Sequence, residues 1–153
     1  KHLTVEPYPA GPLKLSDVEL AWKISEGGAG DRFSKNGLWV SPMPTRLYKK
    51  QQPVWIYYEV YNLTRDDSGR TNYTVDYTIR SGSPPGLVSR VFQGKSQQVS
   101  VAQEQLGARE FEVNHIELDL GESVPGEIVV KVTVKDLISG QTASKEAVFA
   151  VKE

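Results

Sequence analysis

The chain has 153 residues, 39% of them hydrophobic and 24% charged, a balance typical of one folded domain and not of a disordered segment. Its 18 Lys and Arg nearly cancel its 19 Asp and Glu, which argues against the basic surface of a general nucleic-acid binder. The absence of cysteine excludes disulfides, Cys-based zinc sites and thiol nucleophiles.

The first fourteen residues contain several residues that interrupt regular structure: Pro7, Pro9, Gly11 and Pro12. Proline lacks the N–H that a sheet ladder needs, and it resists helix formation. We therefore expect residues 1–14 to form an extended linker or edge segment, and residues 15–153 to form a single folded domain.

A half-buried strand is predicted next, because apolar and polar residues alternate from residue 18 to residue 24. The apolar phase, which we expect to face the core, consists of Val18, Leu20, Trp22 and Ile24. The glycine-rich residues 25–36 predict a flexible loop, and a short apolar segment, GLWVS, follows at residues 37–41.

The most informative stretch is the strand predicted at residues 53–63, PVWIYYEVYNL, because both of its faces carry large side chains. One face of this extended segment presents Val54, Ile56, Tyr58 and Val60, which indicates a core. The other face presents Trp55, Tyr57, Glu59 and Tyr61. This second face is aromatic where a sandwich strand is normally polar.

Three interpretations of the aromatic face stay open. We prefer the first, in which the long connection from Ser25 to Gln52 folds across the face and buries it. That connection carries the apolar residues Phe33, Leu38, Trp39, Val40, Leu47 and Tyr48. In the other two, the face binds a protein partner or stacks on a carbohydrate. The candidate binding residues are Trp55, Tyr57, Glu59, Tyr61 and Trp39.

Three local features are predicted between residues 64 and 120. The turn DDSG at residues 66–69, followed by alternation over residues 73–79, predicts an antiparallel hairpin with the preceding strand. Residues 87–102 predict one or two short strands. Further on, the apolar phase shifts between Val113 and Ile116, which predicts a bulge near Asn114-His115.

The C-terminal residues predict a clear strand pair, because residues 128–134 and 147–151 alternate on either side of a turn at residues 136–140. In total, seven to nine strands without a helical period predict an all-β, two-sheet antiparallel immunoglobulin-like β-sandwich. The order of strands and turns after Leu120 resembles the end of immunoglobulin-like and fibronectin type III modules. Ile128 stands nearest to the place of their corner tyrosine.

Four stretches together resemble the C-terminal region of bacterial GWxTD-domain proteins. They are LSDVELA (15–21), GLWVSPMPTRLYKKQQPVWIYYEVYNL (37–63), YTVDYTI (73–79) and the closing segments VKVTVKD and FAV. The Gly-Trp-x-Thr-Asp motif, which lies in an upstream domain of that family, is absent. The resemblance covers nearly the whole chain and implies a downstream β-rich module with a periplasmic or secreted location. It supplies no catalytic residues.

Sequence motifs for catalysis or metal binding are absent. His115 is the one histidine in a predicted strand, and no Gly-x-Ser-x-Gly elbow accompanies it. Asp66, Asp67 and Asp136 lie in predicted turns, where short acidic side chains hydrogen-bond the backbone. Neither an EF-hand loop nor a His-Glu-x-x-His motif occurs. We therefore predict that the protein is not an enzyme and uses no cofactor and no metal.

These observations predict a non-catalytic accessory or interaction module of a larger exported bacterial protein. Its partner would be a protein, either a neighbouring domain or another subunit, and carbohydrate is the alternative ligand. We expect no nucleic-acid partner. No apolar run approaches the roughly 20 residues that span a bilayer, so we expect no membrane insertion by this segment. The remaining alternative is the C-terminal fragment of an enzyme whose catalytic part lies upstream.

Overall fold

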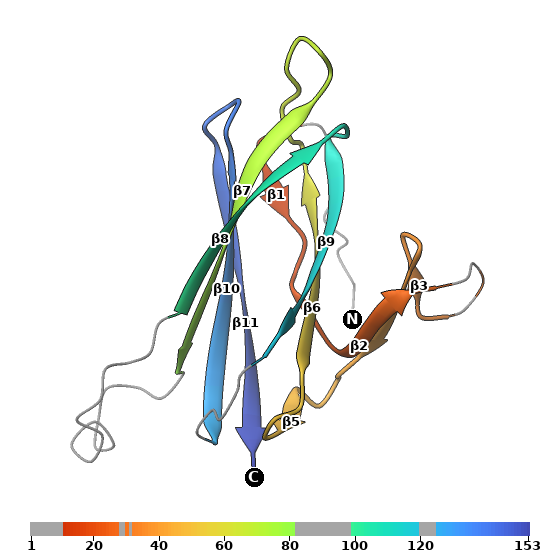
Figure 1. The fold of residues 1–153 in the computed structure, drawn as a ribbon, viewed down its shortest axis with the longest axis vertical. Helices are drawn as coiled ribbons and strands as arrows, with labels where there is room; N and C mark the ends of the chain where they lie inside the picture. The colour runs from red at the N-terminus through yellow and green to blue at the C-terminus, as the bar shows by residue number, and fades with distance from the viewer. Residues whose placement is uncertain (1–10, 28–29, 31, 82–98, 120–124) are drawn as a thin grey trace, which may run out of the picture.

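The computed structural model describes residues 11–27, 30, 32–81, 99–119 and 125–153, and these residues form eleven strands and no helix (Figure 1). In chain order the strands are β1 (Lys14–Leu15), β2 (Glu19–Glu26), β3 (Ser34–Lys35), β4 (Leu38–Pro42), β5 (Leu47–Lys49), β6 (Val54–Tyr61), β7 (Thr71–Ser81), β8 (Val99–Gly107), β9 (Phe111–Leu118), β10 (Gly126–Asp136) and β11 (Thr142–Lys152). In the part of the chain described here, no helix long and apolar enough to cross a membrane is present.

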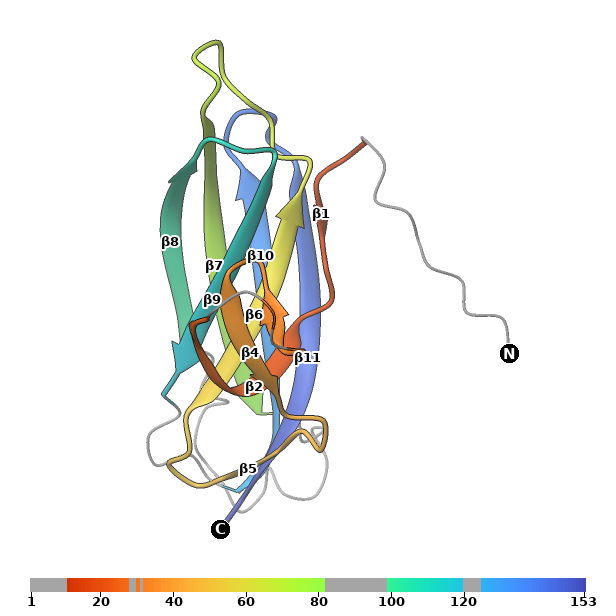
Figure 2. The same ribbon diagram turned by 90° about the vertical axis from the view of Figure 1, so that its right-hand side faces the viewer.

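The strands form two sheets that face each other, as Figures 1 and 2 show. In the first sheet β6 pairs with β9 on one side and with β1 and β2 on the other, and the sheet continues through β4 to β3. The second sheet has the order β5-β11-β10-β7-β8. The predicted all-β sandwich is confirmed. Its strand count exceeds seven to nine because β1, β3 and β5 are too short to show alternation in the sequence.

The core lies between the sheets and is lined by the face of β6 that the alternation predicted. Val54, Ile56, Tyr58 and Val60 are all fully buried. They face the buried valines of β7 and β10, and the hydroxyl groups of Tyr58 and Tyr77 share a hydrogen bond of 2.7 Å across the core. Complete burial of one such aliphatic side chain contributes roughly 1.5–3 kcal/mol, so this layer holds the sandwich together.

The predicted hairpin between β6 and β7 is wrong, because the two strands belong to opposite sheets. Asn62 turns the chain with a φ of 64°, and the buried Leu63 donates its N–H to the carbonyl of Glu110 at 3.0 Å. Residues 62–70 therefore cross from one sheet to the other. Alternation fixes the buried face of each strand, but it does not fix the strand's hydrogen-bonding partner.

The predicted bulge near Asn114-His115 is also wrong. β9 pairs with β6 in unbroken register from Tyr61↔Phe111 to Val54↔Leu118. The apolar phase shifts because Phe111 and Val113 lie on the outer face of the sheet, whereas Ile116 and Leu118 lie opposite the buried residues of β6. The strand changes the face that carries its apolar residues without changing its geometry.

The C-terminal strand pair is confirmed, with β10 and β11 in register from Gly126↔Val151 to Lys135↔Thr142. Near the start of the described residues, Lys14 and Leu15 pair with Tyr61 and Val60. The prediction for residues 87–102 falls largely outside the described residues, and so does most of the predicted N-terminal linker.

Candidate functional site

The middle of the outer face of β6 is covered by a projecting group of strands, which we call the arm: residues 22–27, 30 and 32–42, containing residues 22–26 of β2 together with β3 and β4. Figure 2 shows β2 and β4 in front of β6. β2 pairs with β6 from Glu19 to Ala21, and from Lys23 onward it pairs with β4. β3 and β4 are joined by Asn36 and Gly37, both with positive φ, as a two-residue hairpin turn requires.

Beneath the arm lies a second, smaller apolar core. It consists of Ala21, Ile24, Val40 and Tyr57, with Leu38, Trp55 and Val113 packed at its border. Ile24 and Val40 are cross-strand partners on the arm, so they share the face that meets the sheet. Tyr57 is left only 4% exposed. The middle of the aromatic face is therefore interior.

The polar edge of this face forms a hydrogen-bonded cluster around Glu59. Its carboxylate accepts hydrogen bonds from the Tyr57 hydroxyl at 2.6 Å, from Asn36 Nδ2 at 2.9 Å and from the Tyr61 hydroxyl. Burial and the hydrogen bond to Glu59 raise the pKa of Tyr57, although Asn36 opposes the shift, so this phenol remains a donor at neutral pH. These three donors fix the position of the Glu59 carboxylate, so we assign it a structural role.

The arm is also tied to this face by charge. Lys35 forms an ion pair with Glu19, and its ammonium lies 5.6 Å from the centre of the Tyr57 ring. Asn36 donates a 2.7 Å hydrogen bond to the Tyr57 hydroxyl. Lys35 and Asn36, at the β3–β4 turn, make all three of these contacts. The turn therefore holds the arm against the outer face of β6.

The sequence-predicted site residues fall into two groups. Trp55, Tyr57, Glu59 and Tyr61 lie together on the outer face of β6, where Trp55 stacks on His115 with a centroid distance of 6.2 Å. Tyr61 packs on Phe111 at 5.1 Å. Trp39 is elsewhere, because it pairs with Ser25 and Ser34 on the opposite side of the arm from Val40.

The outward side of the arm carries an aromatic cluster of three rings, Trp22, Phe33 and Trp39. Trp39 lies in the middle, edge-to-face with Trp22 and with Phe33 at centroid distances of 6.3 Å each. Trp22 is 45% exposed, and the guanidinium of Arg32 lies 4.8 Å from the Phe33 ring centre. Trp22 is the exposed member of this cluster, and Phe33 and Trp39 are half-buried.

The arm reaches this geometry through a bulge and a close approach. The register of β2 shifts between Ala21 and Lys23, so Trp22 is an extra residue and lies outside the core where alternation predicted it inside. A Cβ on Gly27 would lie 2.7 Å from the Cβ of Trp39, so only glycine fits there. Alternation did not reveal that Trp22 is exposed, and nothing in residues 25–36 indicated that Phe33 packs on Trp39. The Asn36-Gly37 hairpin signal could have revealed the arm.

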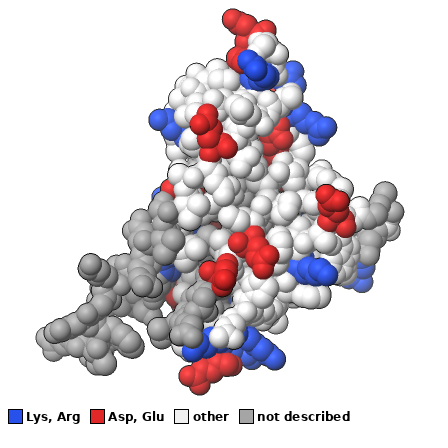
Figure 3. Space-filling view, viewed as in Figure 1, with Lys and Arg blue, Asp and Glu red and all other residues white. Residues whose placement is uncertain are grey.

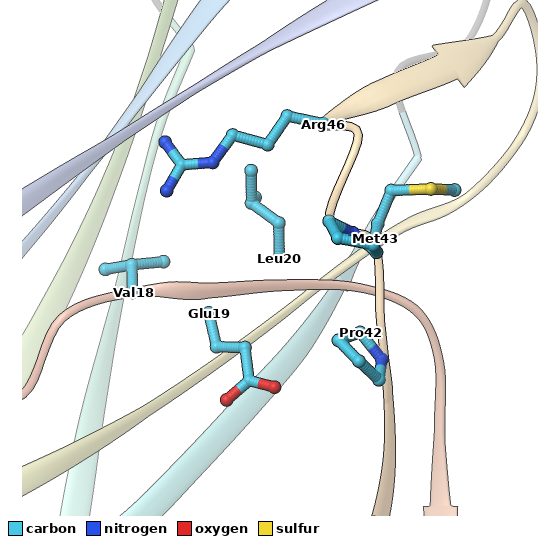
Figure 4. A pocket seen from close by; sticks show the side chains of 7 residues that line it. Val18, Glu19, Leu20, Pro42, Met43 and Arg46 are labelled. Atoms are coloured by element: carbon cyan, nitrogen blue, oxygen red, sulfur yellow. The ribbon is translucent and has the colours of Figure 1, made fainter.

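A shallow hollow of about 210 Å³ lies where the arm leaves the sandwich (Figure 4). It is lined by Val18, Glu19, Leu20, Pro42, Met43, Pro44 and Arg46. Arg46 extends over Leu20 and Val18, whereas the Glu19 carboxylate points away. Its volume is below the roughly 300–1,000 Å³ of typical small-molecule sites, so it offers little to an enclosed ligand.

Acidic and histidine side chains do not gather into a metal site in the described residues. The buried Asp136 accepts backbone N–H groups from Thr64 at 2.8 Å, Ile138 at 2.9 Å and Ser139 at 3.2 Å. Burial by itself raises the pKa of Asp136, but these hydrogen bonds, led by the one from Thr64, lower it below its usual range. Its carboxylate fixes the loops at one end of the sandwich.

The chain matches no known family model and no curated protein.

Proposed function

We propose that the protein is a non-catalytic interaction module that binds a protein partner through the aromatic cluster of its arm. The observation that carries the proposal is the exposed Trp22, held against Trp39 on a strand pair that is itself anchored to the sandwich. Trp and Arg are the residue types most enriched among side chains that dominate binding energy at protein interfaces. The surface beside the cluster also contains an arginine, Arg32, whose guanidinium lies against the Phe33 ring.

A protein partner suits this surface better than a carbohydrate. Sugar rings stack on open aromatic faces, and the rings of this cluster stand at 86° and 88° to one another. The row expected to form a carbohydrate platform has Tyr57 beneath the arm, and Trp55 stacks on His115. An irregular group of perpendicular rings fits the side chains of a folded partner.

The non-catalytic assignment is supported by the engagement of the acidic side chains. Asp66 accepts hydrogen bonds from Ser68 and Arg70 within its own turn. Glu59 and Asp136 are surrounded by donors that position neighbouring chain segments. The hydrogen bonds of these carboxylates therefore stabilise turns and neighbouring strands, which supports a structural role for them and not a catalytic one.

We further propose that the sandwich is immunoglobulin-like and belongs to a larger exported bacterial protein, in a periplasmic or secreted location. The resemblance of residues 15–21, 37–63 and 73–79 and of the closing segments to GWxTD-domain proteins supports the location. One sheet has the order β9-β6-β1/β2 and the facing sheet has the order β8-β7-β10-β11. This strand order supports an immunoglobulin-like fold.

The test is a binding comparison between Trp22→Ala and Leu137→Ala, two exposed apolar residues on different parts of the surface. The immobilised protein is exposed to exported proteins of the source bacterium, and separately to insoluble polysaccharides. We expect one defined protein partner whose affinity falls roughly tenfold or more in Trp22→Ala and is unchanged in Leu137→Ala. Equal binding by both variants contradicts the proposal, and Trp22-dependent retention on polysaccharide replaces it with carbohydrate binding.

A further inference from the structure

The edge strand β8 differs from the other sheet edges of the molecule. Its nine residues, Val99–Gly107, pair with β7, and no other described strand pairs with it. At the opposite edge of the same sheet, β11 is partly covered by β5 and contacted by β1. In the other sheet β3 is two residues long, and the edge strand β9 carries Glu112 and Glu117.

An uncovered strand of this length presents a row of backbone N–H and C=O groups to any second strand. Natural edges are usually guarded by lysine, proline, a bulge or short length. β8 has no lysine, proline or bulge, and it has a single charged residue, Glu104, whereas β9 has two. The backbone of β8 is therefore a ready template for pairing.

The side chains of β8 are correspondingly open. Val101 and Gln103 lie opposite the buried Tyr77 and Val75, which places them on the inward side of the sheet. Val101 is nevertheless 45% exposed, and on the outward side Leu106 is 78% exposed. The sandwich is not closed over β8 by any described strand. Pairing with a further strand would shield these side chains.

We propose that β8 pairs antiparallel with the β8 strand of a second copy of this chain, about a two-fold axis at Gln103. Gln103 is the central residue of the strand, so this register uses all nine residues, from Val99↔Gly107 through Gln103↔Gln103. The two five-stranded sheets then join into one continuous sheet. The interface is isologous and closes at the dimer.

Charge favours this register over an axis at Glu104 and permits the same strand as partner. About Gln103, the carboxylate of Glu104 lies opposite Ala102, whereas an axis at Glu104 would place two carboxylates directly opposite each other. Figure 3 views the molecule as in Figure 1, and Lys, Arg, Asp and Glu are scattered over this face without a patch of one sign. With a net charge of -1, two copies repel one another only weakly.

The register is tested by disulfide trapping, which is unambiguous here because the chain has no cysteine. Directly opposite residues of an antiparallel pair have Cα atoms about 4.5–5.5 Å apart, within the range that a disulfide bridges. Gln103→Cys is therefore expected to form a covalent dimer under mild oxidation. Gln105→Cys alone is not, because its two copies lie four residues apart along the pair, roughly 13 Å.

A heterotypic pair provides the matched control. Mixing Val101→Cys with Gln105→Cys is expected to give a cross-linked heterodimer, because these positions are opposite in the proposed register. Cross-linking of Gln105→Cys to itself in place of Gln103→Cys overturns the register. Equal, slow cross-linking of all the variants indicates random collision and overturns the specific dimer.

Sedimentation of the unmodified protein tests the dimer itself. We expect the mass to rise with concentration from 17.0 kDa toward twice that value. Val101→Lys should remain at the monomer mass with unchanged circular dichroism, since an inward-pointing lysine guards an edge. Leu137→Lys, the same kind of change on the β10–β11 turn, should still dimerise. A wild-type mass that stays at 17.0 kDa at all concentrations contradicts the proposal. The aromatic cluster takes no part in this pairing, so the proposed function stands or falls separately.

Discussion

The two faces of β6 have similar side chains, but their surroundings differ. On the inner face every residue is fully buried between the sheets, and the hydroxyl of Tyr58 shares a hydrogen bond with the hydroxyl of Tyr77. On the outer face one residue, Tyr57, is buried, and it is surrounded by Asn36, Lys35 and Glu59 from the arm and from its own strand. Alternation alone does not distinguish a sandwich core from a face covered by a small accessory layer.

The difference also separates stability from binding. The inner face forms part of the core of the sandwich, so a change there should lower the free energy of unfolding of the whole molecule. The outer face packs against the arm, and the arm presents Trp22 and Trp39 to a partner. We therefore expect changes on the two faces to differ in size and in kind.

The largest effect is expected for Ile56→Ala on the inner face. Removing this fully buried side chain should lower the free energy of unfolding by about 3–4 kcal/mol, because a cavity forms between two packed sheets. Val113→Ala, beneath the arm, should cost about 1 kcal/mol because Val113 is only partly buried. Urea denaturation of both variants measures the difference, and equal losses would show that the arm layer is as tightly packed as the core.

Two carboxylates provide the next comparison. Asp136→Asn should lower the free energy of unfolding by about 2–3 kcal/mol, because an amide group would face one of the backbone N–H donors. Glu59→Gln, half-buried on the outer face, should cost less than about 1 kcal/mol. Thermal and urea unfolding check both values.

The Asp136 contribution also depends on pH in a definite direction. Hydrogen bonds lower the pKa of Asp136 in the folded state, so its stabilisation is complete above the unfolded-state value of about 3.9. It is lost as the pH falls through the lowered folded-state pKa. The stability gap between the wild type and Asp136→Asn should therefore be constant near neutral pH and close in acid. A gap that stays unchanged down to pH 2 would contradict this role.

A smaller but chemically matched pair is Tyr58→Phe and Tyr57→Phe. Loss of the Tyr58 hydroxyl leaves that of Tyr77 buried without its partner and should cost about 1–2 kcal/mol. Loss of the Tyr57 hydroxyl should cost about 0.5–1 kcal/mol, since Glu59 keeps its bonds from Asn36 and Tyr61. If Tyr57→Phe proved the more damaging, the outer hydrogen-bonded cluster would be the stronger of the two.

The sequence was sufficient to predict the sandwich and the buried residues of β6 and β10, because long strands with strict alternation depend little on distant contacts. It was not sufficient to assign β7 to its sheet, since either pairing buries the same face of that strand. The bulge at Trp22 inverted the expected face, and one extra residue leaves no compositional trace. The arm could have been predicted, because Asn36-Gly37 between two short strands is a recognised turn signal.

The proposed function depends most on the arm lying against the outer face of β6. Nuclear Overhauser contacts between the Tyr57 ring and the methyl groups of Ile24, Leu38 and Val40 test this directly. We expect strong contacts to these methyl groups together with slow solvent exchange of the Tyr57 hydroxyl proton, because the ring lies beneath the arm. A Tyr57 ring that shows no contact to the arm and titrates like a phenol in water would contradict this arrangement, and the aromatic face of β6 would then be an open surface.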